Sequence, residues 1–498
     1  QATGSGLGWN LTNRQKVSAV ARMERWQPDG DRQMVKGILA YGAYLPYRRL
    51  DRASITAVTG RGGGVGHRSV ASYDEDTSTM GVEAARLALA GAPVAPDALW
   101  FSTVAPAYLD KTNASLIHAA LRLDTAVPAV DFGGAVRSAV GALRAALAGP
   151  GSTLVAASDI RVGLPTSPEE ASGGDAAVAV LTGSSDEGSL LAEYLGGASA
   201  TAEFTDRWRS PGATHSRTWE ERFGEHAYGP LVDQAWAAAL VDAALSADDI
   251  DLAVVTGLHG RATRRAAGRL SVPVVDDLAD TVGNTGAAHP ALLLAGALDV
   301  AGSDRVIALV VLADGCEVLL FRTTGSLAGG RPLLSVATQI DHRADVAYAD
   351  YLSWRGLLEV QAPNRPEPNR PSSSAAYRQA DWKYGLVGSR DATTGTTHLP
   401  PSRVGIGGGD VDDMVPAPMS HAVGSITTFT VDRLAYSQAP PVVFAVVDFD
   451  GGGRMPVELT DVDSDDVAVG DRVEMTFRRL FTADGLHNYF WKARPVRG

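Results

Sequence analysis

Apolar runs of strand length alternate with Ala-rich runs of helical spacing between residues 34 and 330, and this alternation constrains the fold more than any other feature. The first round includes ALWFSTV at 98–104, NASLIHAALRL at 113–123 and STLVAASDI at 152–160. A second round follows from about residue 190 to 322, and the two rounds share no evident repeat. Strands that alternate with helices predict a layered α/β fold with two βαβα halves.

The chain changes character after this region. Residues 361–376, QAPNRPEPNRPSSSAA, are rich in Pro, Asn and Ser, which is typical of a linker or a wrapping arm. From about residue 419, five short strand-like runs are separated by Gly, Asp and Pro turns, as in HNYFWKARPV at 487–496. This pattern predicts a small all-β barrel of the OB type.

The composition argues against several classes of function. The net charge of −13 disfavours nonspecific binding to nucleic acid or to an anionic membrane surface. The only cysteine, Cys316, allows no intrachain disulfide and no cysteine-based zinc site, and it indicates a reducing, cytoplasmic setting. No run reaches the about 18 apolar residues that a membrane helix needs. The polar residues 1–33 are interpreted as an upstream extension or a cloning remnant.

Five segments resemble the thiolase superfamily, and within it the branch of 3-hydroxy-3-methylglutaryl-CoA (HMG-CoA) synthase and ketoacyl synthase III. They are KGILAYGAYLPYRRL at 36–50, SYDEDTSTMGVEAARLAL at 72–89, DFGGAVRSAVGALRAAL at 131–147, SGGDAAVAVLTG at 172–183 and VGNTGAAHPALLLAGAL at 282–298. Residues 204–228 are similar to an insertion of archaeal-type synthases. The resemblance implies a homodimer and acyl-CoA as a ligand.

The C-terminal part resembles the DUF35 family, a rubredoxin-like ribbon followed by an OB barrel. Proteins of that family accompany thiolases and synthases, and in archaea such a subunit bridges the two enzymes, which implies a thiolase-family partner. The predicted domains are a thiolase/HMG-CoA synthase-like domain at 34–335, a linker arm with a degenerate ribbon at 336–418, and an OB-fold domain at 419–498. We expect the arm at 351–380 to pack across a neighbouring surface.

The chain departs from the family where the chemistry would take place. Val136 stands at the position of the nucleophilic Cys, and Val104 at that of the Glu that acts as general acid and base. Ser138 is a weak substitute nucleophile, because no adjacent base is evident. Glu75 belongs to a different family position and is interpreted as a helix-start acid.

The polar positions of the second half are also altered. Thr256 stands where the catalytic His is expected. His259, three residues later, is the candidate that could take its place. The alternative is that His259 is a structural residue at the start of a helix. Asn284, in Gly283-Asn284-Thr285-Gly286, matches the family Asn that helps hold the oxyanion, but it also suits a turn that caps the next helix. His289 is interpreted as a packing or capping residue.

The ribbon has lost its metal ligands as well. Where that family has Cys-x-x-Cys-Gly, this chain has Asp391-Ala392-Thr393-Thr394-Gly395, and no cysteine follows. Asp391 and His398 alone are a poor zinc set, because structural sites use four ligands. We therefore expect no metal and no bound cofactor other than CoA or acyl-CoA as a ligand.

Three functional readings follow from these features. The first is a non-condensing assembly or acyl-CoA-binding subunit, a pseudoenzyme that partners a thiolase-family enzyme. The second is a Cys-independent enzyme on the same fold, such as a retro-aldolase or acyltransferase, with Tyr108, Tyr228 and His259 as candidate acid or base groups. The third is ordinary synthase activity through Cys316, which lies in a strand-like run where a buried thiol behaves as a small hydrophobe.

Overall fold

The computed structural model describes residues 34–406 and 411–496. The expectation for residues 1–33 lies outside the described residues. From Val35 onward the chain forms one compact unit. No described helix is both long enough and apolar enough to cross a bilayer.

The synthase-like part is built on a nine-stranded mixed sheet with the order β11-β12-β13-β8-β1-β7-β6-β4-β5. The strands of the first half are β1 (Lys36–Tyr44), β4 (Ala98–Ser102), β5 (Ala129–Asp131), β6 (Thr153–Ile160) and β7 (Asp175–Ser184). Those of the second half are β8 (Ala192–Thr201), β11 (Leu252–Gly257), β12 (Val306–Leu312) and β13 (Gly315–Thr323). Within this nine-stranded sheet, only the pairs β4/β5, β4/β6 and β11/β12 are parallel. The halves join where Gly37 and Ile38 of β1 meet Glu193 and Ala192 of β8.

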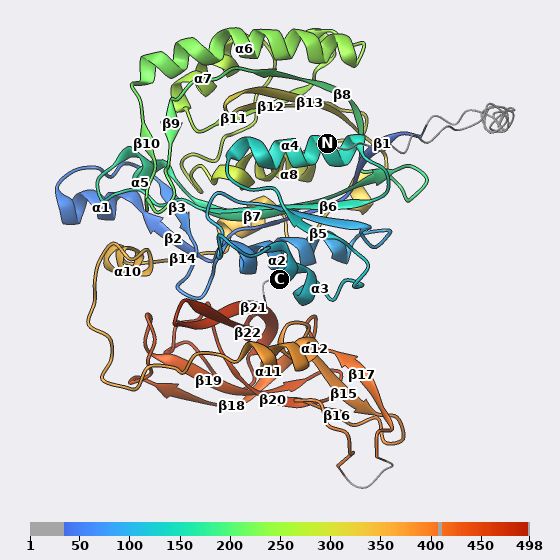
Figure 1. Cartoon of the computed structure of the whole chain (residues 1–498), viewed down its shortest axis with the longest axis vertical. Coiled ribbons are helices and arrows are strands. Elements are labelled where there is room, and N and C mark those ends of the chain that lie inside the picture. The colour runs from blue at the N-terminus through green and yellow to red at the C-terminus, as the bar shows by residue number, and fades with distance from the viewer. Residues whose placement is uncertain (1–33, 407–410, 497–498) are drawn as a thin grey trace, which may run out of the picture. The chain divides into compact units, whose positions relative to one another are not determined.

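Helices lie on both sides of each half and between the halves (Figure 1). The outer layers are α2 (Thr77–Ala90) with α3 (Ala114–Leu121), and α6 (Glu221–Asp242) with α7 (Gly260–Arg269). The central layer consists of α4 (Val136–Ala148) and α8 (His289–Val300). The sequence of α8, HPALLLAGALDV, is apolar almost all round, which suits a helix covered on every side. The predicted layered α/β fold is confirmed.

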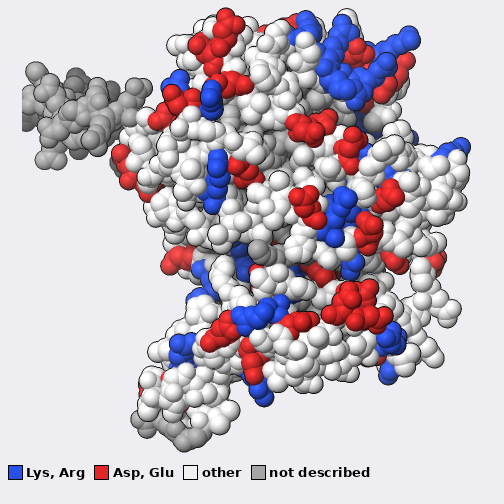
Figure 2. Space-filling view, turned by 180° about the vertical axis from the view of Figure 1, so that it is seen from behind, with Lys and Arg blue, Asp and Glu red and all other residues white. Residues whose placement is uncertain are grey.

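Shorter elements complete this part of the chain. The helices are α1 (Arg52–Thr59), α5 (Pro168–Ser172), α9 (Val336–Asp341) and α10 (Tyr348–Trp354). A small sheet is formed by β2 (Arg48–Asp51), β3 (His67–Val70) and β14 (Ala344–Asp345), and a hairpin by β9 (Arg207–Trp208) and β10 (Arg217–Thr218). On the face that Figure 2 shows, acidic and basic side chains are interspersed.

The C-terminal part is an all-antiparallel five-stranded sheet of the order β20-β19-β18-β21-β22, consistent with the predicted OB fold. Its strands are β18 (Val423–Asp432), β19 (Val442–Phe449), β20 (Arg454–Glu458), β21 (Arg472–Ala483) and β22 (Leu486–Pro495). An isolated β-bridge joins Leu459, just after β20, to Ala493 of β22 and so brings the two edge strands of the sheet together. The ribbon before it contains β15 (Val387–Asp391), β16 (Thr397–His398) and β17 (Met414–Pro418), and α11 (Ser373–Arg378) and α12 (Ala380–Lys383) precede the ribbon. The exact domain boundaries stay a prediction.

The barrel packs on α2 through buried ion pairs. Lys492 Nζ lies 3.0 Å from Asp74 Oδ2, and Arg494 Nη2 lies 3.1 Å from Glu83 Oε2. All four side chains are at most 6% exposed, so these charges have partners but almost no solvent. The apolar core beneath α2 also continues into the barrel. The two parts of the chain therefore share one interior.

This interface corrects the reading of Glu75. The N-cap of α2 is Asp76, whose side chain accepts a hydrogen bond from Thr79 N. Glu75 is buried instead, where it accepts from Tyr44 Oη at 2.5 Å and from Ser72 N at 2.7 Å and pairs with Arg478 of the barrel. Helix-start acids are ordinarily solvated, whereas this one anchors a neighbouring domain.

The expected arm begins on the surface of its own domain. In α10, Tyr348 and Tyr351 are buried, and Tyr348 Oη donates to Glu170 Oε1 at 2.9 Å. Arg355, just after α10, pairs with the buried Asp175. The residues from 359 to 374 that follow are mostly exposed. Only the start of the arm, through Tyr351 and Arg355, therefore packs on the same chain's α/β domain, and the packing of the rest of the arm stays a prediction.

Candidate functional site

A cavity of about 790 Å³ opens between the two α/β halves. Its walls come from the loop after β4, the start of α4, the hairpin β9–β10, α6 and the turn after β12. Apolar lining residues include Phe101, Val104, Val136, Leu258 and Leu312. Charged lining residues are Asp131, Arg161, Asp206, Arg207, Arg209 and Asp314. The volume is within the range of small-molecule sites.

Val136 begins α4 and lines this cavity with 6% of its surface exposed. An alkyl side chain at this place offers no nucleophile. Ser138, two residues further along α4, donates its hydroxyl hydrogen to Gly133 O at 2.8 Å, so the hydroxyl is committed to the backbone. The Val136 turn therefore presents an apolar surface to the cavity.

Val104 lines the same cavity, and its backbone is held from two sides. Its N–H donates to Asp159 Oδ1 at 3.0 Å, and Arg209 donates to its carbonyl oxygen. Asp159 also accepts from Thr103 Oγ1 at 3.2 Å and from Ala287 N at 2.9 Å. Burial raises the pKa of Asp159. This carboxyl group ties the Val104 loop to the start of α8.

His259 and Asn284 have structural partners. Nδ1 of His259 accepts from Ala262 N at 3.1 Å, which caps α7, and Nε2 lies 2.9 Å from Glu221 O. Asn284 donates from Nδ2 to Gly257 O at 3.0 Å and accepts from Gly286 N at 3.0 Å. Among Thr256, His259, Asn284 and their neighbour Leu258, only Leu258 lines the cavity. These bonds favour the capping alternatives for both residues, and their site roles stay a prediction.

The lone thiol and His289 are buried in the interior. Cys316, on β13, is 0% exposed and does not line the cavity, and burial raises the pKa of its thiol to about 12. His289 is almost fully buried, and Thr285 N donates to its Nδ1 at 3.3 Å. Burial lowers the pKa of His289 to about 4, so the ring is neutral at pH 7. Both groups are packing residues.

Sequence reasoning missed the arginines of the cavity. Arg161 follows β6, and Arg207 and Arg209 belong to RWR in the hairpin segment. Arg161 Nη2 lies 2.5 Å from Glu169 Oε1, and Arg207 Nη2 lies 2.7 Å from the same oxygen. Burial alone would raise the pKa of Glu169, but the two arginines outweigh it and lower that pKa to about 2. The RWR triplet could have pointed to Arg207 and Arg209, whereas Arg161 carries no such signal.

Tyrosines line two other parts of the wall. Tyr228 of α6 is 4% exposed, and burial together with Asp206 and Asp314 raises its pKa. Tyr108 Oη accepts from His487 N of the barrel at 2.8 Å, and their rings lie 4.9 Å apart. The tip of the barrel hairpin therefore contacts the rim of the cavity.

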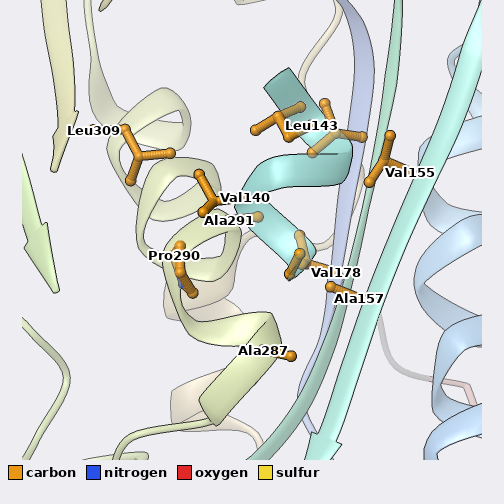
Figure 3. A pocket seen from close by; sticks show the side chains of 11 residues that line it. Val140, Leu143, Val155, Ala157, Val178, Ala287, Pro290, Ala291 and Leu309 are labelled. Carbon is orange, nitrogen blue, oxygen red and sulfur yellow. The ribbon is translucent and has the colours of Figure 1, made fainter. Parts of the chain in front are cut away.

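A second, small cavity lies in the central layer (Figure 3). It measures about 20 Å³, and its lining is apolar, with Val140 and Leu143 of α4 facing Pro290 and Ala291 of α8. A space of this size holds about one water molecule, and apolar walls give such a water no partners. This is a packing gap and does not extend the site.

The ribbon is closed by hydrogen bonds. Asp391 Oδ1 accepts from Thr393 N and Thr394 N, both at 2.9 Å, and Ser389 Oγ donates to Ser402 O at 2.9 Å. In the part of the chain that the structure describes, no three His, Cys, Asp or Glu side chains are grouped as metal ligands. The carboxylate of Asp391 is thus engaged by the backbone of its own turn.

Known proteins match both parts of the chain. Residues 418–478 match the family described as ChsH2, C-terminal OB-fold domain. Hydroxymethylglutaryl-CoA synthase of Thermococcus sibiricus is 31% identical over 287 residues, which cover 54% of this chain and 81% of that protein. The synthase of Methanopyrus kandleri is 28% identical over 349 residues, which cover 65% of this chain and 98% of that protein.

Solved structures share the fold of the first part. An HMG-CoA synthase complexed with CoA superposes with a TM-score of 0.56 at 16% identity and covers 68% of this chain and 95% of that chain. PksG, an HMG-CoA synthase from Bacillus subtilis, superposes with a TM-score of 0.55 at 20% identity. The superposition covers 65% of this chain and 89% of that chain. At this identity the likeness establishes the fold.

Proposed function

Because the chain belongs to the hydroxymethylglutaryl-CoA synthase family, we propose that it binds an acyl-CoA thioester in the 790 Å³ cavity and does not condense it. The observation that carries this proposal is the pair of valines, Val136 and Val104, that line the cavity at the predicted nucleophile and acid/base positions. Neither side chain can accept an acyl group or a proton. Ligand binding needs only the cavity, which is retained.

Two features support acyl-CoA as the ligand class. The cavity has an apolar surface for an acyl chain beside several polar groups that can orient a thioester. Solved relatives of the same fold have been captured with CoA and with 3-hydroxy-3-methylglutaryl-CoA. A non-condensing subunit would hold such a thioester for an enzyme that performs the chemistry.

The proposed setting is a homodimer that associates with a thiolase-family enzyme. The barrel is already docked in cis on α2 and against Tyr108 at the cavity rim. The barrel therefore holds part of the cavity wall in place from within the same chain. This arrangement suits a subunit that holds or delivers a ligand. Light scattering of the full chain tests the dimer.

The test of the main proposal combines binding with intact-mass spectrometry. We expect butyryl-CoA to bind the wild-type protein in calorimetry, and incubation with acetyl-CoA or acetoacetyl-CoA to leave the protein mass unchanged. Val104→Trp fills the cavity wall and should abolish binding, whereas Val300→Trp, at an exposed site (77% exposed), should not. A stable acyl adduct on any residue, or no binding of any CoA ester, would refute the proposal.

A second function, cleavage of a 3-hydroxyacyl-CoA, is favoured by the cluster of Tyr228, Asp206 and Asp314. The Asp206 carboxylate would accept the 3-hydroxyl proton through the neutral Tyr228 hydroxyl that it hydrogen-bonds while the Cα–Cβ bond breaks, and the enolate formed would take that proton back at Cα. The products are a carbonyl compound and a shortened acyl-CoA. Release of both from a 3-hydroxyacyl-CoA by the wild type, and its loss in Tyr228→Phe, would support this reaction.

A further inference from the structure

The main chain of Arg161 is held in the cavity wall by two side chains from other segments. Arg161 directly follows β6 and lines the cavity. Its N–H donates to Asp175 Oδ1 at 2.9 Å, and its carbonyl oxygen accepts from Arg68 Nη2 at 2.8 Å. The ladder between β6 and β7 ends one residue earlier, so these side chains satisfy the backbone groups that the ladder leaves. The place of this part of the wall therefore depends on what holds Arg68 and Asp175.

Helix α10 holds both of them from the side away from the cavity. The side chains of Arg68 and Asp175 are fully buried. Tyr351 Oη accepts from Arg68 Nη1 at 3.0 Å, and the guanidinium carbon of Arg68 lies 5.0 Å from the centre of the Tyr351 ring. Arg355, just after α10, pairs with Asp175 and lies 5.4 Å from the centre of the same ring. A hydrogen bond and a cation–π contact to one guanidinium group restrict its position.

A second connection runs through the short helix α5. Tyr348 of α10 donates to Glu170 Oε1 at 2.9 Å. The neighbouring carboxylate, Glu169, lies with Oε1 2.5 Å from Arg161 Nη2 and 2.7 Å from Arg207 Nη2. Two consecutive residues of α5 thus contact α10 and the cavity arginines, respectively. Helix α10 therefore supports Arg161 through its main chain and through its side-chain partner.

Helix α10 itself lies outside the site. None of its described residues lines the cavity. It is held by a small apolar core of its own, in which Tyr348 and Tyr351 pack with Leu50, Ile55 and Val70. Removing one hydroxyl group from α10 should therefore loosen Arg68 and leave the helix in place. Ligand affinity can then change without loss of the fold.

We propose that Tyr351 and Arg355 are positioning residues of the cavity, which hold Arg161 in its wall through Arg68 and Asp175. This rests on the proposed binding of an acyl-CoA. The helix thereby sets the affinity of a site that it does not touch. By linkage, a ligand that binds better to the braced wall also stabilises α10.

The first test measures the affinity for S-butyl-CoA, an unreactive thioether, by calorimetry. Tyr351→Phe removes an acceptor of Arg68 and should weaken binding about fivefold, as the loss of one hydrogen bond to a charged group permits. The matched control is Tyr41→Phe, which removes a similarly buried hydroxyl that donates to Asp299 Oδ1 at 2.8 Å. The control should bind within about twofold of the wild type. Wild-type affinity of Tyr351→Phe would overturn the positioning role and leave acyl-CoA binding intact.

A double-mutant cycle tests the route through Arg161. If α10 acts by placing Arg161, Tyr351→Phe should have almost no effect on affinity in an Arg161→Met background. An undiminished loss in that background would overturn this route. If no CoA compound binds any of these proteins, the proposed function itself fails.

Hydrogen exchange of the wild-type protein tests the same coupling without a variant. Bound S-butyl-CoA should slow amide exchange in α10 more than in α1, which shares the small apolar core through Ile55. This result is expected only if the ligand stabilises the brace, because α10 does not line the cavity. Equal slowing in both helices, or none in α10, would overturn the proposal.

Discussion

Lys492 Nζ lies 3.0 Å from Asp74 Oδ2, and both side chains are fully buried between the barrel and the α/β domain. These residues are far apart in the sequence, and Lys492 also pairs with Glu458 of the barrel. The barrel is therefore attached as a part of the interior of the molecule. The first three predictions follow from this attachment.

Removing one partner of this pair should lower the free energy of unfolding of the whole chain. Lys492→Met leaves the carboxylate of Asp74 buried with fewer counter-charges, and we expect a loss of about 3–5 kcal/mol in the free energy of unfolding. Denaturant titration measures this loss. The matched control is Arg454→Met, which breaks the exposed pair with Asp448 and should leave the midpoint almost unchanged. Similar midpoints for the two variants would show that the interface charges contribute little.

The acid stability of the protein should depend on Glu83. Burial alone would raise the pKa of this side chain, but Arg86 and Arg494 lower it from 4.5 to about 2. A depressed folded-state pKa contributes stability above pH 4.5 that is lost as the pH falls toward 2, and here this amounts to about 3 kcal/mol. The unfolding free energy of the wild type should therefore fall relative to Glu83→Gln across this window. The exposed control Glu359→Gln should differ from the wild type in unfolding free energy by the same amount across this window. A difference between the wild type and Glu83→Gln that is equally constant with pH would contradict the prediction.

Cutting the linker should not separate the barrel from the α/β domain. A protease site inserted at 364–368 places the cut in an exposed segment. The buried ion pairs and shared core should keep both fragments in one peak in size-exclusion chromatography. Truncation at about residue 345 should instead yield insoluble protein, because Asp74 loses Lys492 and Arg478 and the apolar core beneath α2 loses the barrel that covers it. Elution of the cut chain as two species would show that the barrel is only tethered.

The thiol of Cys316 should be inert in the native protein. Burial raises its pKa to about 12 and excludes reagents, so we expect no reaction with a disulfide reagent at pH 8 until the chain is unfolded. Val136→Cys adds a second thiol on the cavity wall, which should react without unfolding. Synthase turnover should still be absent in that variant, because Val104 and Thr256 provide no proton transfer. Fast native labelling of wild-type Cys316 would disagree with its position on β13.

The ribbon should fold without zinc. Asp391 satisfies two backbone N–H groups of its turn, so purified protein should contain well under one zinc per chain, and a chelator should not change the melting temperature. Asp391→Ala should lower the melting temperature because it leaves those donors without an acceptor. Stoichiometric zinc by elemental analysis would show that the site had been misread.

The sequence alone established the element types, because strand and helix periodicity is a local property. The alternation between 34 and 330 predicted the α/β layers, and the short runs after 419 predicted the barrel. It also located Val136 and Val104, since each follows a recognisable turn. The same reasoning placed Asn284 and His259 near the site but left open which groups form hydrogen bonds with their side chains. Hydrogen-bond partners depend on atoms brought together by folding.

Charge pairing was decided only by the tertiary structure. Glu75 read locally as a helix-start acid, whereas the fold buries it against Arg478, about 400 residues further along the chain. Arg161 and Arg207 belong to separate segments and carry no pattern that links them, yet both meet Glu169 at the cavity wall. Charged residues follow no helix or strand period when their partners come from other segments. The sequence therefore determined which side chains are available, and long-range packing determined which of them neutralise one another.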